Sequence, residues 1–124
     1  MNDRERKETI VLQTNVQRKG VAMDVMWKTV QEEGVNVLVV SEPNKKRVKG
    51  VEWMTDVRED VAVRVCGRHE KGEMFGKGEG FVWIKFSDWV LYGCYISPNI
   101  DIGRYSKFLD DLGESVNTWE GEVV

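Results

Sequence analysis

The amino-acid sequence predicts a mixed α/β fold in which parallel and antiparallel strands belong to one sheet system. Three observations predict it: a strand–helix–strand unit in residues 9–40, several short strands in residues 53–97, and a second amphipathic helix from about residue 102. Residues 1–8 are expected to be a charged amino-terminal tail, and residues 9–124 to be a single domain.

The strand–helix–strand unit has the clearest pattern. Residues 9–15 have the β-branched density of a strand, and residues 35–40 form the nearly continuous apolar run of a strand covered on both faces. From about Gly20 to Glu33, apolar positions recur at three- and four-residue spacing and predict a helix that ends at Gly34. The stripe consists of Ala22, Val25, Met26, Thr29 and Val30. A βαβ unit of this kind predicts that its two strands are parallel.

The rest of the chain predicts shorter elements. Residues 43–50 are expected to be a basic loop with Lys45, Lys46, Arg47 and Lys49, and residues 67–78 a glycine-rich, charged loop. Strands are expected at residues 53–55, 60–66, 80–86 and 89–97, the last two joined by a hairpin. The final helix has Asp101 as its N-cap and an apolar stripe of Ile102, Tyr105, Leu109, Leu112 and Val116.

The composition is that of an ordinary globular protein, with 41% hydrophobic and 31% charged residues. A net charge of −3 argues against a general electrostatic grip on nucleic acid, although a site that recruits divalent cations must itself be acidic. Cys66 and Cys94 lie in apolar stretches and are expected to be buried free thiols. No membrane span or signal peptide is expected, which favours an intracellular location without distinguishing nucleus from cytoplasm.

Two polar residues end the strands of the βαβ unit. Glu42 comes directly after the buried strand, at the carboxyl end where open α/β sheets place their ligands, and Asn15 holds the equivalent position on the first strand. Neighbouring strands lie about 4.8 Å apart, so both side chains can face one point. An oxygen pair of this kind suits Mg²⁺. Alternatively, Glu42 caps a turn before Pro43 and Asn15 satisfies loop backbone.

A third segment, Val90–Asn99, is an apolar strand that ends in Tyr95, Ser97 and Asn99. Together with Leu12–Asn15 and Ser41–Pro43, it resembles in order and character the exonuclease–endonuclease–phosphatase superfamily. The resemblance is strongest to the apurinic-type endonuclease domains of non-LTR retrotransposons, and it extends from about residue 10 to the end. It implies a two-sheet mixed β-sandwich flanked by helices, of which this chain is the amino-terminal half.

The resemblance also implies roles. Glu42 is expected to bind Mg²⁺ or Mn²⁺, with Asn15 supporting metal or phosphate binding. Tyr95 is expected to direct its hydroxyl at the scissile phosphate, and Asn99 to hold that region or contact the phosphate; packing and turn roles are the alternatives for both. The chemistry implied is phosphodiester hydrolysis by an activated water, with DNA as the substrate of the full-length parent domain.

The sequence departs from that family in its later motifs. A strand ending in Gly-Asp-x-Asn is absent, and Val123–Val124 resembles only its beginning. The chain alone is therefore expected to be inactive and to leave one sheet face exposed, open to a protein partner. His69 is expected to be a loop residue rather than a general base, and the basic loop to be solvated or to contact phosphate. The alternatives are a non-catalytic fragment that binds a partner or nucleic acid, and a truncated gene model.

Overall fold

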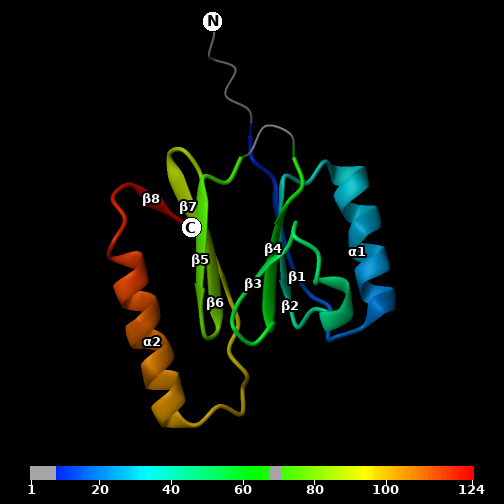
Figure 1. The fold of residues 1–124 in the computed structure, drawn as a ribbon. Coiled ribbons are helices and arrows are strands. Elements are labelled where there is room, and N and C mark those ends of the chain that lie inside the picture. The colour runs from blue at the N-terminus through cyan, green and yellow to red at the C-terminus, as the bar shows by residue number, and fades with distance from the viewer. Residues whose placement is uncertain (1–7, 68–70) are drawn as a thin grey trace, which may run out of the picture.

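The computed structural model describes residues 8–67 and 71–124, which form two four-stranded sheets with a helix against the outer face of each (Figure 1). The elements of the first half are β1 (Val11–Asn15), α1 (Gly20–Glu33), β2 (Val37–Ser41), the 3-10 turn η1 (Lys45–Arg47), β3 (Met54–Thr55) and β4 (Val61–Val65). Those of the second half are β5 (Met74–Gly78), β6 (Phe81–Lys85), β7 (Trp89–Cys94), α2 (Ile102–Val116) and β8 (Glu122–Val123).

Both sheets are mixed, as the sequence predicts. The first has the order β1-β2-β4-β3, with β1 and β2 parallel and paired from Val11 with Val37 to Asn15 with Ser41. The second has the order β5-β6-β7-β8, with the predicted β6–β7 hairpin antiparallel and β7–β8 parallel. The predicted βαβ unit is confirmed, since α1 connects the parallel pair and ends at Gly34 in the left-handed conformation (φ 66°).

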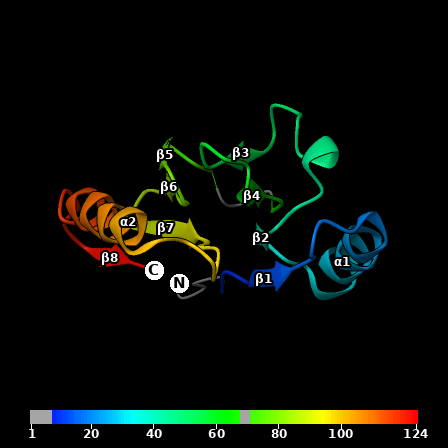
Figure 2. The same cartoon turned by 90° about the horizontal axis from the view of Figure 1, so that it is seen from below.

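The core lies in two layers, one between α1 and the first sheet and the other between the two sheets (Figure 2). Valines of β2 and β4 pack there against Val82, Ile84 and Leu91 of the second sheet. Gly93 of β7 lies where the sheets approach closely: a Cβ at this position would be 3.0 Å from Val63 and 3.1 Å from Val39. The close approach fixes how the sheets sit on each other, and hence the strand ends that they bring together.

The buried stripe agrees only in part with the predicted one in α1 and differs from it in α2. In α1 the buried residues are Met23, Met26 and Val30, whereas Val25 is 61% exposed. In α2 only Phe108 is buried, against Phe81, and Ile102 is 81% exposed. The spacing of apolar residues locates the buried face of a helix only approximately. Which residues of that face are buried depends on the side chains of the sheet that the helix packs against.

A strand replaces part of the predicted glycine-rich loop. Residues 74–78 form β5, which pairs antiparallel with β6, while His69 lies outside the described residues. The glycines have a packing reason, because a Cβ at Gly76 would be 2.5 Å from the Trp83 ring and one at Gly78 would be 2.5 Å from the Phe81 ring. Ladder hydrogen bonds and cross-strand aromatic rings therefore outweigh the low strand propensity of glycine here.

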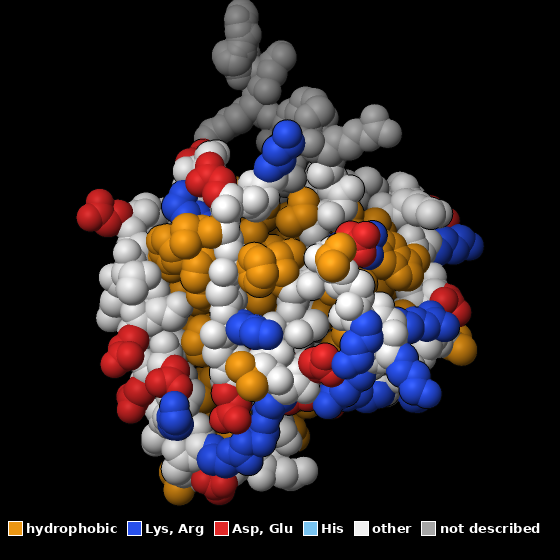
Figure 3. Space-filling model, viewed as in Figure 1, with side chains coloured by type: hydrophobic (Ala, Val, Ile, Leu, Met, Phe, Trp, Pro, Cys, Tyr) orange, Lys and Arg blue, Asp and Glu red, His pale blue; other side chains and the backbone are white. Residues whose placement is uncertain are grey.

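The expectation of an uncovered sheet face is wrong for the described residues, because α1 packs on the first sheet and α2 on the second. Exposed apolar side chains lie on both helices and on edge strands, for example Val21 on α1, Ile102 on α2 and Phe75 on β5. On the face in Figure 3, hydrophobic side chains gather mainly over the upper half and Lys and Arg mainly over the lower half.

Two other expectations concern the thiols and the membrane. Cys66 and Cys94 are free, as expected, but each is only partly buried. In the described part of the chain, no helix has the length and apolar character that a membrane crossing requires.

Candidate active site

The three motif segments of the sequence meet at one end of the molecule, here called the loop end, where β1, β2 and β7 finish (Figure 1). Asn15 ends β1 and pairs with Ser41, so Glu42 lies one residue beyond it on the neighbouring strand. Tyr95 follows β7 in the other sheet. The loop end therefore gathers polar side chains from both sheets.

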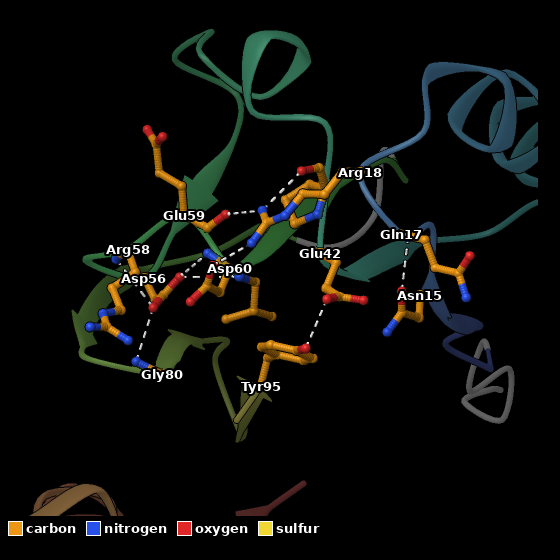
Figure 4. Close-up of polar contacts among 12 residues, drawn as sticks. Asn15, Gln17, Arg18, Glu42, Asp56, Arg58, Glu59, Asp60, Gly80 and Tyr95 are labelled. Atoms are coloured by element: carbon orange, nitrogen blue, oxygen red, sulfur yellow. Dashed lines mark hydrogen bonds and ion pairs between the residues drawn. The ribbon is translucent and has the colours of Figure 1, made fainter. Parts of the chain in front are cut away.

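Glu42 and Tyr95 are in direct contact. The Tyr95 hydroxyl donates a hydrogen bond of 2.8 Å to Glu42 Oε2, and in the view of Figure 4 the carboxylate lies between Tyr95 and Asn15. The hydrogen bond to the Glu42 carboxylate, helped by burial and by the charges of Glu42 and Asp60, raises the pKa of the Tyr95 hydroxyl. Tyr95 is thus held as a protonated donor at neutral pH.

The backbone of Glu42 is held in an unusual conformation. Its φ of 50° lies in the left-handed region, which costs a residue other than glycine about 1–2 kcal/mol. Two hydrogen bonds fix it there: its N–H donates to Asp60 O at 2.8 Å, and its C=O accepts from Arg18 N at 2.7 Å. Strained residues of this kind cluster at functional sites, so the conformation favours a functional role for Glu42.

Arg18 ties the loops around Glu42 together, a role that the sequence pattern does not reveal. Its guanidinium donates to Pro43 O at 3.1 Å, to Glu59 O at 2.9 Å and to Asp60 Oδ1 at 2.5 Å. Like Gln17 before it, Arg18 has a positive φ, of 63°. The only sequence signal for this role is the position of Arg18 in the short connection between β1 and α1. Its hydrogen-bond partners could not be predicted, because they are 25–42 residues away in sequence.

Asp56 is the second residue that sequence analysis did not single out. It is 1% exposed, and its carboxylate accepts hydrogen bonds from Asp60 N at 2.7 Å, Val61 N at 3.1 Å and Gly80 N at 2.9 Å (Figure 4). Val61 begins β4 and Gly80 precedes β6, so one carboxylate joins the two sheets. A buried carboxylate with several backbone donors is a stable arrangement, because each N–H satisfies part of the buried charge.

The remaining two candidates are less closely engaged. Asn15 Oδ1 accepts a hydrogen bond of 2.9 Å from Gln17 N, which is the loop-satisfying role that the sequence left open. Asn99 lies in the exposed turn after β7, where its N–H donates to Ser97 Oγ at 3.2 Å. The structure thus brings Glu42 and Tyr95 into contact and Asn15 onto the adjacent strand end, while Asn99 makes no hydrogen bond to Glu42 or Tyr95.

The basic loop is partly neutralised. Arg47 pairs with Asp24 at 2.7 Å and Lys49 with Glu59 at 2.8 Å, while Lys45 and Lys46 are exposed. The hydrogen bond from Lys49 lowers the pKa of the Glu59 carboxyl. These pairs favour the solvated role for Arg47 and Lys49.

The donor set at Glu42 fits a hard cation with few protein ligands. Within residues 8–67 and 71–124, no three His, Cys, Asp or Glu side chains form a cluster that could hold a metal ion. Glu42 Oε2 is occupied by Tyr95, while its Oε1 makes no hydrogen bond to a described residue. Mg²⁺ commonly takes only one or two carboxylates from the protein and keeps several waters, so this single carboxylate is compatible with it.

Comparisons with known proteins support the fold. No family model matches the sequence, and no curated protein matches it either. Among solved structures, the endonuclease domain of TRAS1, a telomere-specific non-LTR retrotransposon, is similar with a TM-score of 0.59 and 19% sequence identity. The match covers 82% of this chain and 52% of that domain, so the chain spans about half the length of the solved structure.

Proposed function

We propose that this chain is the amino-terminal part of a divalent-metal-dependent DNA endonuclease of the retrotransposon type. The observation that carries the proposal is the contact between Glu42 and Tyr95, made across two sheets in a fold shared with an endonuclease domain. The proposed reaction is hydrolysis of a phosphodiester bond in DNA by water, with Mg²⁺ or Mn²⁺ as the cofactor.

Each candidate residue has a role in this proposal. Glu42 would hold the cation, and Asn15 would ligate it or bind phosphate from the adjacent strand end. When bound, the cation would neutralise charge that develops on the phosphate and leaving oxygens. Tyr95 would orient the Glu42 carboxylate in the absence of DNA, and its single hydroxyl proton would turn to a phosphate oxygen when DNA binds. Asn99 would donate its amide to the same phosphate.

We further propose that the chain alone binds the cation but hydrolyses DNA poorly. The Gly-Asp-x-Asn motif, whose aspartate aligns the attacking water in the family that the sequence resembles, does not occur in the sequence. Orientation and activation of water usually contribute orders of magnitude to the rate, so their loss leaves binding largely intact but slows cleavage.

Metal binding tests the proposal directly. Titration with Mn²⁺, followed by calorimetry and by the electron paramagnetic resonance of the free ion, should detect a site that Glu42→Gln weakens at least tenfold. Glu52→Gln is the matched control, because it makes the same change at an exposed residue. Equal affinities of the two variants would overturn the role of Glu42.

A nicking assay on supercoiled DNA tests the activity of the chain alone. The unsubstituted chain is expected to nick the DNA no faster than the Glu42→Ala variant does. Faster nicking by the unsubstituted chain would show that it acts alone.

A protein partner is a second candidate, favoured by the exposed apolar side chains beside the β1 edge. Ile10 and Val11 are exposed there, and Val21 and Val25 are exposed on α1. A strand edge with exposed apolar side chains can pair with another chain. Sedimentation velocity over a range of concentrations tests for self-association, and a monomer throughout argues against a second copy as that partner.

A further inference from the structure

A small pocket lies beside Tyr95. Its lining includes Arg58, Asp60, Glu79, Tyr95, Ser97 and Arg104. Tyr95 lines this pocket and also donates a hydrogen bond to Glu42, so the pocket adjoins the proposed cation site.

Two arginines share one carboxylate in this pocket. Arg58 Nε lies 3.4 Å from Glu79 Oε2, and Arg104 Nη2 lies 3.3 Å from the same oxygen. Both distances exceed the roughly 2.7–2.9 Å of a strong charge-assisted hydrogen bond. One carboxylate therefore holds two guanidinium groups weakly, and the three side chains together carry one positive charge.

The backbone around these three side chains is anchored. Arg58 N donates to Asp56 Oδ2 at 3.3 Å, and Gly80 N, next to Glu79, donates to the same oxygen at 2.9 Å. Arg104 N is capped by Asp101 Oδ1 at 2.9 Å. The arginines thus come from segments 46 residues apart and project from fixed positions, with 39% and 44% of their side-chain surfaces exposed.

We propose that Arg58 and Arg104 form a subsite for one backbone phosphate of the nucleic acid, and that Glu79 occupies the place of this phosphate when no nucleic acid is bound. The inference rests on the proposed endonuclease function, since the pocket adjoins the site at which the phosphodiester bond would be cut. A guanidinium group matches the geometry of phosphate oxygens, and a phosphodiester has two such oxygens for two arginines. Displacing Glu79 costs little, because exposed ion pairs contribute only about 0–1 kcal/mol.

The subsite would give a chain of net charge −3 a local contact for a polyanion. The positive charge resides on the two guanidinium groups, and Glu79 would screen it until a phosphate displaces the carboxylate. Contacts to phosphate carry no sequence information, so this subsite would fix the register of the strand rather than select its bases.

DNA binding to the full chain, measured by fluorescence anisotropy with a labelled 20-base-pair duplex in EDTA, tests the subsite without cleavage. Arg58→Gln and Arg104→Gln should each weaken binding several-fold. The double variant should lower the slope of log affinity against log salt by about 0.9, the value for one phosphate. Glu79→Gln should strengthen binding several-fold, because it removes the competing anion.

Lys107 and Asp111 supply matched controls on α2, since they form an exposed pair at 2.7 Å that does not line the pocket. Lys107→Gln removes one positive charge, as each arginine variant does, and Asp111→Asn removes one negative charge, as Glu79→Gln does. Both control variants should alter affinity by less than twofold. Arginine variants no weaker than Lys107→Gln, or no binding of the unsubstituted chain at low salt, would overturn the subsite. Competition by inorganic phosphate at concentrations as low as those of DNA phosphate would show a site for free anions instead.

Mn²⁺ binding tests the cation site independently of the phosphate subsite. The arginine variants should bind Mn²⁺ as the unsubstituted chain does, whereas Glu42→Gln should lose the ion and keep the arginine-dependent DNA affinity. If Glu42→Gln binds Mn²⁺ normally while the arginine variants bind DNA weakly, the metal proposal alone is rejected. If Glu42→Gln loses Mn²⁺ affinity while the arginine variants bind DNA normally, the subsite alone is rejected. Urea midpoints for each variant show whether the fold is preserved.

Discussion

The Tyr95 hydroxyl donates a hydrogen bond of 2.8 Å to Glu42 Oε2, although the two residues follow strands of different sheets. The contact joins positions 53 residues apart in sequence. Because Tyr95 holds Oε2, it also fixes the orientation of the whole carboxylate, including Oε1. If Glu42 binds a cation, the quality of that site therefore depends on the second sheet as well as on the first.

Tyr95→Phe should weaken Mn²⁺ binding about tenfold, because groups that orient a metal ligand typically contribute 10- to 100-fold to affinity. The ring still packs, so the urea midpoint should change little. Calorimetric titration measures the first quantity and urea unfolding the second. Tyr105→Phe on α2 is the matched control. If Tyr105→Phe lowers the Mn²⁺ affinity as much as Tyr95→Phe does, the prediction is contradicted.

Arg18→Gln should lower the free energy of unfolding by about 1–2 kcal/mol, because three hydrogen bonds around Glu42 are lost or weakened. Mn²⁺ affinity should fall with it, since the Arg18 side chain no longer ties Pro43, next to Glu42, to the loop at Glu59 and Asp60. Urea unfolding and calorimetry provide the two readouts. Arg47→Gln, which removes an exposed pair with Asp24, should cost less than about 1 kcal/mol.

Asp56→Ala should cost about 3 kcal/mol or more, because backbone N–H groups of Val61 and Gly80 lose their buried acceptor. Asp56→Asn should cost less, since its amide oxygen still accepts some of these bonds. Asp110→Ala on the exposed face of α2 should stay within about 0.5 kcal/mol of the unsubstituted chain. Equal unfolding free energies of Asp56→Ala and Asp110→Ala would show that the carboxylate does not join the sheets.

Gly93→Ala should destabilise the fold by about 1–3 kcal/mol, because its new methyl group would be 3.0–3.3 Å from three valines of the facing sheet. Gly113→Ala in α2 is the opposite case. Nothing lies within 4 Å of a Cβ there, so alanine should stabilise the helix by about 0.5–1 kcal/mol. Thermal unfolding of both variants tests the spacing between the sheets, and a stabilised Gly93→Ala would contradict it.

The two thiols should react slowly with a disulfide reagent at pH 8. Burial raises the pKa of the Cys66 and Cys94 thiols, so a smaller fraction is thiolate at any pH below that pKa. The rate should rise as the pH approaches the raised pKa, and it should rise at constant pH when urea unfolds the chain. The variants Cys94→Ser and Cys66→Ser show which thiol reacts at which rate. Rates equal to that of a small free thiol would reject the prediction.

Local sequence patterns predicted the parts of the fold that rest on local interactions. The bounds of α1 and the N-cap Asp101 follow from spacing and capping chemistry, and both agree with the structure. β5 was missed because its strand character comes from the rings of Trp83 and Phe81 on the neighbouring strand. The buried position of Met23 was missed for a related reason, since the first sheet decides which row of α1 faces inward.

The site divides in the same way. Glu42 and Asn15 were predicted from their places at strand ends, and the structure sets them on adjacent strands. Arg18, Asp56 and the arginine pair around Glu79 were not predicted, because each acts on partners that are distant in sequence. Asp56 reaches Gly80, for example, only because a turn and two sheets bring residues 24 positions apart together.

The double attachment of Asp56 has a consequence for local opening. The amide protons of Val61 and Gly80 are held by the same carboxylate, one at the start of β4 and one just before β6. Asp56 itself lies in the turn between β3 and β4, so the second sheet cannot swing away from the first without breaking the bond to Gly80 N, whereas the bond to Val61 N stays within the first sheet. Native-state hydrogen exchange should therefore find that the Gly80 amide opens when the sheets separate, and that the Val61 amide opens only when the first sheet itself unfolds.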